Sequence, residues 1–200
     1  FYHLLGNFGL AIILLTLTIK LVFLPLTKAS FDSMRGMQEL QPEMKALRER
    51  IKDPNQLNQE IMALYKKKGV NPMGGCLPML IQIPVFLGLY NALLNSIELR
   101  HAPFALWIND LSSPETLHLW GINVPVMVLL MGVSMFVQQY FTPTSGDPAQ
   151  KKMMYFMTLF FTFIFIQGAF PAGLVLYWLT NNIISIIQQA FLRGQSKIGS

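Results

Sequence analysis

Several polar side chains interrupt long apolar runs, and their types and spacing suggest a shared chemistry. Lys20 lies inside the run LTLTIKLVFLPLTK (15–28), four residues after Thr16, so both side chains share one face of a helix. Other apolar runs contribute amide, hydroxyl and indole groups: Gln139, Tyr177, Trp178, Asn181, Ser185 and Gln188. The amide, hydroxyl and indole groups can hydrogen-bond, and the Lys20 ammonium can attract acidic side chains. Ionisable groups within a membrane usually face a water-filled cavity. We therefore expect a hydrated groove that carries one positive charge.

The apolar run around Lys20 offsets the cost of its charge. A lysine at the centre of a membrane helix costs roughly 2.5–3.5 kcal/mol, whereas each Leu, Ile, Val or Phe returns about 0.3–0.6 kcal/mol. Twelve of these apolar residues lie between Leu10 and Leu26. Lys28 is eight residues further on, about 12 Å along a helix. One alternative to the groove is therefore that the Lys20 stem snorkels to the surface. Another is that the amides and hydroxyls only join helices.

The sequence contains none of the common catalytic patterns. We find no HExxH, no GxSxG and no Walker loop, and His3, His101 and His118 are scattered. The single cysteine, Cys76, excludes an intramolecular disulfide and is expected to pack rather than react. No Asp or Glu lies within the expected membrane spans, which argues against a carboxylate proton relay. We predict that the protein is not an enzyme, with no catalytic residues, metal ligands or cofactor.

Composition and hydropathy predict an all-α membrane protein. The chain is 52% hydrophobic and only 12% charged, whereas soluble domains carry about 25% charged residues. A spanning helix needs roughly 20 apolar residues, and Pro171-Ala172-Gly173 divides the last apolar stretch into two such segments. The expected transmembrane helices are therefore five, at about 6–27, 75–96, 122–141, 153–170 and 173–192. Because the chain starts at Phe1, we expect it to be a fragment that lacks its natural N-terminus.

The distribution of basic residues predicts the orientation. The segment 28–72 holds nine of the 15 Lys and Arg residues, whereas 97–121 holds only Arg100. Basic loops stay cytoplasmic. We therefore expect cytoplasmic segments at 28–72 and 142–152, an extracytoplasmic loop at 97–121, an outside N-terminus and an inside C-terminus.

Residues 28–72 predict a cytoplasmic helical hairpin. Two apolar stripes at helical spacing define its helices: Leu40, Met44, Leu47 and Ile51, then Leu57, Ile61 and Leu64. Pro42 should kink the first helix or start a new one, and Asp53 is a candidate N-cap ahead of Pro54. Its basic residues, including Arg48, Arg50, Lys66, Lys67 and Lys68, suggest a docking arm for cytosolic partners or for anionic lipid. The alternative is a merely solvated loop.

Several segments resemble the bacterial members of the YidC/Oxa/Alb family of membrane protein insertases. They cover most of the chain in the family's order: PLTKASFDSM (25–34), LQPEMKALRERI (40–51), ALYKKKGVNPMGGCLPMLIQIPVFLGLY (63–90), ELRHAPFALWINDLS (98–112) and FPAGLVLYWLTNNIISIIQQ (170–189). The resemblance implies a five-span insertase core in the bacterial cytoplasmic (inner) membrane, without the large periplasmic domain of Gram-negative members.

The resemblance also implies a role for the groove. Lys20 matches the family's groove cation, which is usually arginine, and Trp178 stands where a second tyrosine is familiar beside Tyr177. Nascent membrane proteins would enter the groove from the cytoplasm and leave into the lipid bilayer. The hairpin resembles a region implicated in recruiting substrates and partners, which would include the ribosome and the Sec translocon. We expect no sequence-specific nucleic-acid partner. A solute transporter or channel and a structural scaffold are the alternative functions.

Overall fold

The protein is almost entirely helical. The structure is a computed structural model that describes residues 1–75, 77–95, 99–119, 121–142, 148–168 and 170–198. Cys76 and residues 143–147 of the expected 142–152 loop lie outside these residues. The elements in chain order are α1 (Tyr2–Leu5), α2 (Phe8–Val22), α3 (Leu24–Glu39), α4 (Gln41–Arg50), α5 (Pro54–Lys68), the 3-10 helix η1 (Pro72–Gly75), α6 (Leu77–Asn95), β1 (Leu117–Leu119), β2 (Ile122–Val124), α7 (Val126–Phe141), α8 (Pro148–Gln167) and α9 (Ala172–Ile198).

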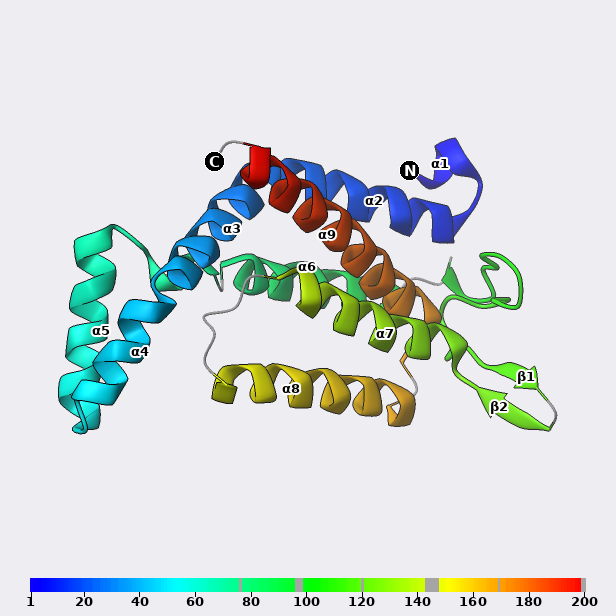
Figure 1. Ribbon diagram of the computed structural model, residues 1–200. Helices are drawn as coiled ribbons and strands as arrows, with labels where there is room; N and C mark the ends of the chain where they lie inside the picture. Colours follow the sequence, from blue (N-terminus) through cyan, green and yellow to red (C-terminus); the bar gives the residue numbers. More distant parts are fainter. Residues whose placement is uncertain (76, 96–98, 120, 143–147, 169, 199–200) are drawn as a thin grey trace.

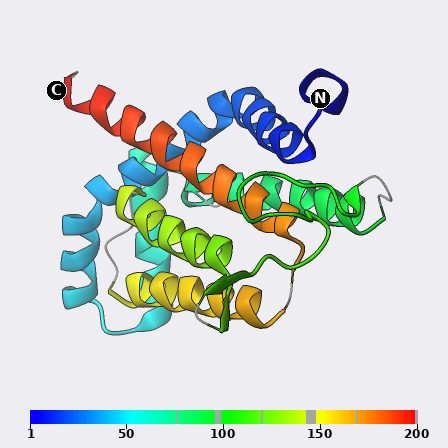
Figure 2. The same cartoon turned by 90° about the vertical axis from the view of Figure 1, so that its right-hand side faces the viewer.

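Helix α9 runs through the middle of the bundle. It packs against α2 on one side and α7 on another, α8 packs against α7, and α6 also contacts α9. Figure 1 shows the α4–α5 hairpin at one end of these helices and the β1–β2 hairpin at the other. Figure 2 shows α9 crossing the bundle diagonally between α2 and α7.

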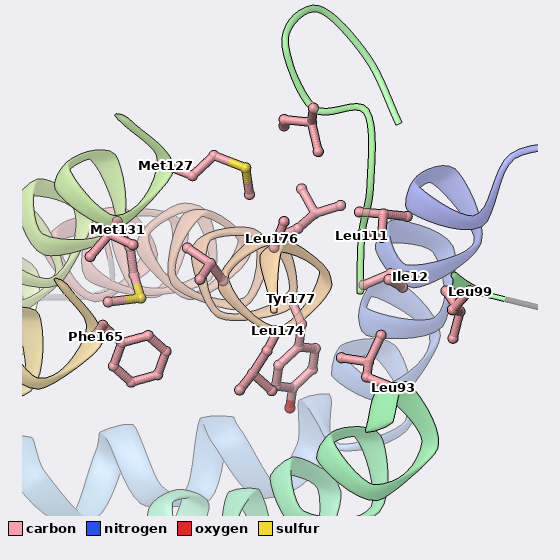
Figure 3. Packing of buried hydrophobic residues seen from close by; sticks show 14 residues of the cluster. Ile12, Leu93, Leu99, Leu111, Met127, Met131, Phe165, Leu174, Leu176 and Tyr177 are labelled. Atoms are coloured by element: carbon pink, nitrogen blue, oxygen red, sulfur yellow. The ribbon is translucent and has the colours of Figure 1, made fainter. Parts of the chain in front are cut away.

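The main apolar core forms where the N-terminal half of α9 meets its neighbours. Leu174, Val175 and Tyr177 are almost completely buried there, together with Leu111 and Met131. Figure 3 shows the labelled residues of this cluster, with Ile12 and Leu93 on the opposite side of α9 from Met131. Burial of such side chains is the main favourable term that holds helices together in water. In a bilayer, close packing takes over that role.

A sharp bend at Phe23 separates α2 from α3. The two helix axes differ by 62°, and Pro25 occupies the first turn of α3. Proline is tolerated there because the first-turn N–H groups have no partner within the helix. Pro42 acts in the same way in the first turn of α4. Of the two outcomes expected for Pro42, a kink or a new helix, the structure shows the new helix. The bend turns the chain out of the bundle and into the hairpin.

Helices α4 and α5 form a hairpin with a small core of its own. Leu40, Met44 and Tyr65 are buried between them, and the Tyr65 hydroxyl donates to Met44 Sδ at 3.3 Å. Burial raises the pKa of Tyr65, and the Arg48 guanidinium partly opposes that shift. The Asp53 carboxylate accepts from the backbone N–H groups of Asn55 and Gln56, which confirms it as the N-cap of α5.

The segment expected to open the third span is partly a strand. Residues 122–124 form β2, paired with β1 around Gly121 at φ 81°, and α7 begins only at Val126. Pro125 has no N–H for a helical hydrogen bond, so the helix begins after it. By length and composition, one described stretch, Met73–Leu93, suffices to cross a bilayer, and the bent pair α2–α3 would be a second if counted as one span.

Candidate functional site

The Lys20 side chain joins α2 to α9. Its ammonium donates to Ser185 Oγ at 2.7 Å, and Ser185 Oγ donates in turn to the Asn181 carbonyl at 2.8 Å. Ser185 is buried, whereas Lys20 is only partly buried. A cation in such a place keeps its charge only with polar partners or water nearby. The sequence-predicted residues Lys20, Asn181 and Ser185 therefore come together.

A small cavity of about 30 Å³ lies beside Lys20, at the elbow between α2 and α3. Its lining includes Phe23, Thr27 and Gln82 as well as Lys20. A volume of this size is about the space that one water occupies. The cavity thus has room for one water next to the ammonium, and it is bounded by α2, α3 and α6.

Gln82 connects this cavity to Tyr177. Its side-chain amide donates to the Tyr177 hydroxyl across α6 and α9, and Tyr177 is otherwise buried in the apolar core. Gln82 was not among the residues expected in the groove. The available signal was one of three amides in the charge-free run of the second expected span, with Asn91 and Asn95. A single amide of this kind is more often a contact between helices than part of a site.

Thr16 and Gln188, also expected in the groove, make no hydrogen bond to Lys20 among the described residues. Thr16 is 1% exposed, and its hydroxyl donates to the Ile12 carbonyl of its own helix at 2.7 Å. Thr16 therefore packs between α2 and its neighbours, without a hydrogen bond to Lys20 in the described structure. The Gln188 side chain is partly buried, and its Oε1 is a buried acceptor without a partner among the described residues. An incoming donor would satisfy it.

Trp178 lies in an aromatic cluster rather than beside Lys20. Its ring makes edge contacts with Phe86 at 5.4 Å and with Phe165 at 5.5 Å between ring centroids. Phe161 completes the cluster at 6.2 Å. These separations fall in the favourable range for aromatic pairs. Trp178 therefore joins α9 to α6 and α8, about two helical turns before Ser185 on the same helix.

Gln139 belongs to a second polar set between α7, α8 and α9. Its amide donates to the Thr158 hydroxyl and to the Met154 carbonyl, both on α8. The structure therefore does not bring Gln139 to Lys20. In the same set Asn182 donates to Ser134 Oγ at 2.9 Å, and the Thr142 hydroxyl donates to Gln189 at 3.0 Å. These contacts hold α7 against its neighbours.

The basic residues of the hairpin differ in whether they form an ion pair. Lys68 pairs with Glu43 at 2.8 Å across α4 and α5, whereas Lys66 and Lys67 are exposed near the end of α5. Arg50 and Lys67 border an open groove of about 400 Å³ between the two helices. In the described part of the chain, no group of His, Cys, Asp or Glu is arranged to hold a metal ion.

The loop 99–115 crosses the opposite end of the bundle and ties its helices together. Ala172 and Gly173, at the start of α9, donate from their backbone N–H groups to the carbonyls of Ser113 and Leu111. The buried Glu115 carboxylate accepts from the Trp107 indole and from the Met127 backbone at 3.0 Å. A negative charge is favourable at the N-terminus of α7. The loop therefore fixes the ends of α7 and α9.

Asp110 organises the backbone of this loop. Its carboxylate accepts from the Ser112 backbone at 2.8 Å, the Ser112 hydroxyl at 2.7 Å and the His101 backbone at 3.1 Å. Burial alone would raise the pKa of Asp110, but these hydrogen bonds and the nearby His101 outweigh it and lower the pKa below its usual 3.8. The charged form of Asp110 is thus the one that the folded loop favours.

Comparison with known proteins assigns this chain to a protein family. The model of the 60Kd inner membrane protein family matches residues 1–198. "Membrane protein insertase YidC" from Syntrophus aciditrophicus is 55% identical over 196 residues, covering 98% of this chain and 34% of that protein. The protein of the same name from Citrifermentans bemidjiense is 53% identical over 192 residues, covering 96% and 34%.

A solved structure supports the same relationship. The one described as "Active YidC insertase crystal structure with the first transmembrane domain resolved" matches with a TM-score of 0.72 and 31% identity, covering 93% of this chain and 42% of that chain. The chain spans about a third of the length of the curated relatives it matches.

Proposed function

We propose that this chain, which belongs to the 60Kd inner membrane protein family, inserts membrane proteins into a lipid bilayer and helps them fold. Its relatives are named as insertases rather than as enzymes. The observation that carries the proposal is the Lys20 ammonium, held at 2.7 Å from Ser185 beside a cavity that is large enough for a water. A charged group at this depth is expensive in a bilayer and therefore points to function.

The proposed mechanism uses hydrogen bonds and charge, and no covalent bond forms. A short hydrophilic segment of a nascent chain enters from the cytoplasm beside α2 and α9. Lys20 attracts its acidic residues, while the Gln82 amide and the Ser185 hydroxyl lower the cost of removing them from water. The apolar segment of the substrate then moves sideways into lipid.

We place the chain in the inner membrane as a multi-pass protein with five spans, formed by α2, α6, α7, α8 and α9. Figure 1 shows α2, α6, α7 and α8 running roughly alongside one another, with α9 crossing them obliquely, and their outer surfaces carry many exposed apolar side chains, such as Val133, Phe156 and Ile187. Large exposed apolar surfaces mark contact with lipid or partners. The basic hairpin would lie in the cytoplasm with the C-terminus, and the 99–119 loop outside with the N-terminus.

The charge of Lys20 is tested with purified protein in vesicles. The substrates are two single-span proteins whose translocated tails are acidic or neutral. We expect Lys20→Met to reduce insertion of the acidic-tailed substrate severalfold and to leave the neutral-tailed one nearly unchanged, with Lys20→Arg retaining both. Lys28→Met, which removes an exposed lysine after the bend, is the matched control. Equal insertion of both substrates by Lys20→Met would remove Lys20 from the mechanism.

Photocrosslinking separates insertion from a scaffold or a solute channel. A crosslinker at Asn181, which is half-buried beside Ser185, should capture a nascent single-span chain during translation. A pure scaffold would give no such product. Flux of small ions through vesicles that hold only this protein would instead favour a channel.

We propose that the α4–α5 hairpin is a docking arm for the ribosome or the Sec translocon. The exposed Lys66 and Lys67 support this role. Because exposed charges are screened by salt, binding of ribosomes to vesicles that contain the protein should weaken as ionic strength rises. The double substitution Lys66→Gln/Lys67→Gln should weaken it further, with Lys52→Gln as the control on the same hairpin. If ribosomes bind equally well to the double variant, these lysines are not the contact.

A further inference from the structure

An exposed leucine stands at the tip of the outer loop in an unfavourable backbone conformation. Leu106 has φ 57° and is 86% exposed, the highest exposure among the large apolar side chains of the described residues. A left-handed backbone is disfavoured for residues that carry a Cβ atom. Such an outlier persists only where its surroundings impose it, and it often marks a functional position.

The neighbours of Leu106 are fixed to the bundle and impose this conformation. The Phe104 carbonyl accepts from the Asn7 side chain at 3.0 Å, and its ring covers Gly9 so closely that a Cβ there would lie 2.0 Å from Phe104 Cδ2. On the other side, the Trp107 indole donates to the buried Glu115 carboxylate. Two aromatic residues are thus directed inward, and the chain between them turns Leu106 outward.

The backbone of this tip is also internally bonded. The Phe104 N–H donates to the Ile108 carbonyl, and the Ile108 N–H donates to the Ala105 carbonyl, both at 3.0 Å. Leu106 is therefore presented on a closed turn. Pro103 and Ala105 are exposed beside it, so the tip is uncharged and apolar.

The tip lies at the level where the apolar outer surface of α2 begins. Asn7, which holds Phe104, is the N-cap of α2, and the first strongly exposed apolar residue of that helix is Leu10, less than one turn further on. One helical turn is about 5 Å. Side chains at such a depth meet the boundary between lipid headgroups and acyl chains.

We propose that Leu106 is a membrane anchor that inserts into the outer headgroup–acyl boundary and holds the 99–115 loop on the bilayer surface. The inference rests on the proposed membrane-spanning arrangement. A lipid surface fits the tip better than a protein partner, because a stable protein interface buries about 1,200–2,000 Å². The tip offers one exposed leucine, with the exposed Ala105 next to it and Pro103 three residues before it.

Depth-dependent fluorescence quenching tests this anchor. An environment-sensitive NBD label is attached to Leu106→Cys in a Cys76→Ser protein, reconstituted in phosphatidylethanolamine and phosphatidylglycerol vesicles. Asn109→Cys, exposed in the same loop, is the matched polar control, and Leu17→Cys, exposed on α2, reports on the span itself. We expect shallow doxyl lipids to quench the label at position 106 at least about twofold more than at 109, as interfacial insertion requires. Aqueous iodide should quench the label at position 109 more than the label at position 106.

The outcomes separate the anchor from the membrane arrangement. If iodide quenches positions 106 and 109 equally, while lipid still quenches position 17, the anchor is overturned and the spans stand. If lipid quenches neither 106 nor 17, the proposed arrangement fails with it. A blue shift at 106 without lipid quenching would mean that a second copy of the chain covers the tip, which also overturns the lipid anchor.

Discussion

The Lys20 ammonium and the Ser185 hydroxyl lie 2.7 Å apart, although 165 positions separate them in the chain. Their hydrogen bond joins the end of α2 to the middle of α9. Ser185 passes the contact on to the Asn181 carbonyl, so the cation is anchored to the backbone of α9 through one hydroxyl. The charge of Lys20 and the position in which Ser185 holds it are two properties that substitutions can test separately.

Replacing Ser185 separates anchoring from charge. Ser185→Ala removes the acceptor and should lower the free energy of unfolding by about 1–2 kcal/mol, because hydrogen bonds to charged groups are worth somewhat more than neutral ones. The charge remains, so insertion of an acidic-tailed substrate should stay well above that of Lys20→Met. Thermal unfolding in detergent and insertion into vesicles measure the two effects. Ser185→Thr keeps the hydroxyl and is the control. If Ser185→Ala reduced insertion of the acidic-tailed substrate as much as Lys20→Met, the effects of position and charge would not be separable.

The hydrogen bond between Asn182 and Ser134 should stabilise the contact of α7 with α9. Asn182 is 2% exposed and donates to Ser134 Oγ at 2.9 Å. Hydrogen bonds between membrane helices are worth about 0.6–2 kcal/mol, so Asn182→Ala should destabilise the protein by about that amount. A double-mutant cycle with Ser134→Ala measures the coupling by thermal unfolding. Additive effects would mean that the two side chains contribute independently.

The close contact between Gly9 and Phe104 should make the outer loop sensitive to a single methyl group. An added Cβ at Gly9 would lie 2.0 Å from the Phe104 ring, so Gly9→Ala must displace the ring. Overpacking of this kind costs about 1–3 kcal/mol, which a lower unfolding temperature would reveal. Gly88→Ala on α6 is the matched control, because nothing lies within 4 Å of its added Cβ. Alanine favours a helix over glycine, so that control should be neutral or stabilising. A Gly9→Ala protein as stable as Gly88→Ala would contradict the contact.

Asp110 should make the stability of the outer loop depend on pH. Its pKa in the folded protein is below its usual value of 3.8, so its contribution to stability is present above about pH 4 and is lost as the pH falls through the folded pKa. Asp110→Asn should therefore be less stable than the parent protein at pH 7.

The difference in unfolding temperature between Asp110→Asn and the parent should shrink as the pH is lowered below 3.8, because the parent carboxyl then also becomes neutral. Unfolding followed by circular dichroism in detergent from pH 7 to pH 3 measures this difference. A gap that stays constant over that range would show that the charge of Asp110 does not stabilise the loop.

Regular features with strong sequence signals were predictable. The all-helical class follows from the long apolar and amphipathic runs, and the helical structure and its solved relative confirm it. The resemblance to the insertase family is likewise confirmed. Asp53 was recognisable as an N-cap because its short side chain accepts hydrogen bonds and because Pro54, which follows it, is favoured in the first turn of a helix.

Contacts that depend on the partner helix were not predictable. Gln138 and Gln139 are adjacent and point in directions about 100° apart on a helix, so only the position of α8 decides that Gln139 meets Thr158. Gln82 was missed because an isolated amide has no periodicity. The strands β1 and β2 have three residues each, too few for an alternating pattern, and Ile122 and Val124 extend the apolar run of the following helix.

The lengths of α2 and α7 have a consequence for the bilayer around them. α2 has 15 residues and α7 has 16, so their axes are only about 22–24 Å long at 1.5 Å per residue. The hydrocarbon layer of a typical membrane is about 30 Å thick. Wherever these two helices border lipid, the mismatch must be taken up by upright helices and by acyl chains that compress along the protein wall. In the proposed membrane arrangement, the flank that carries Lys20 on α2 would be one of these places, so a chain passing there would have less hydrocarbon to cross.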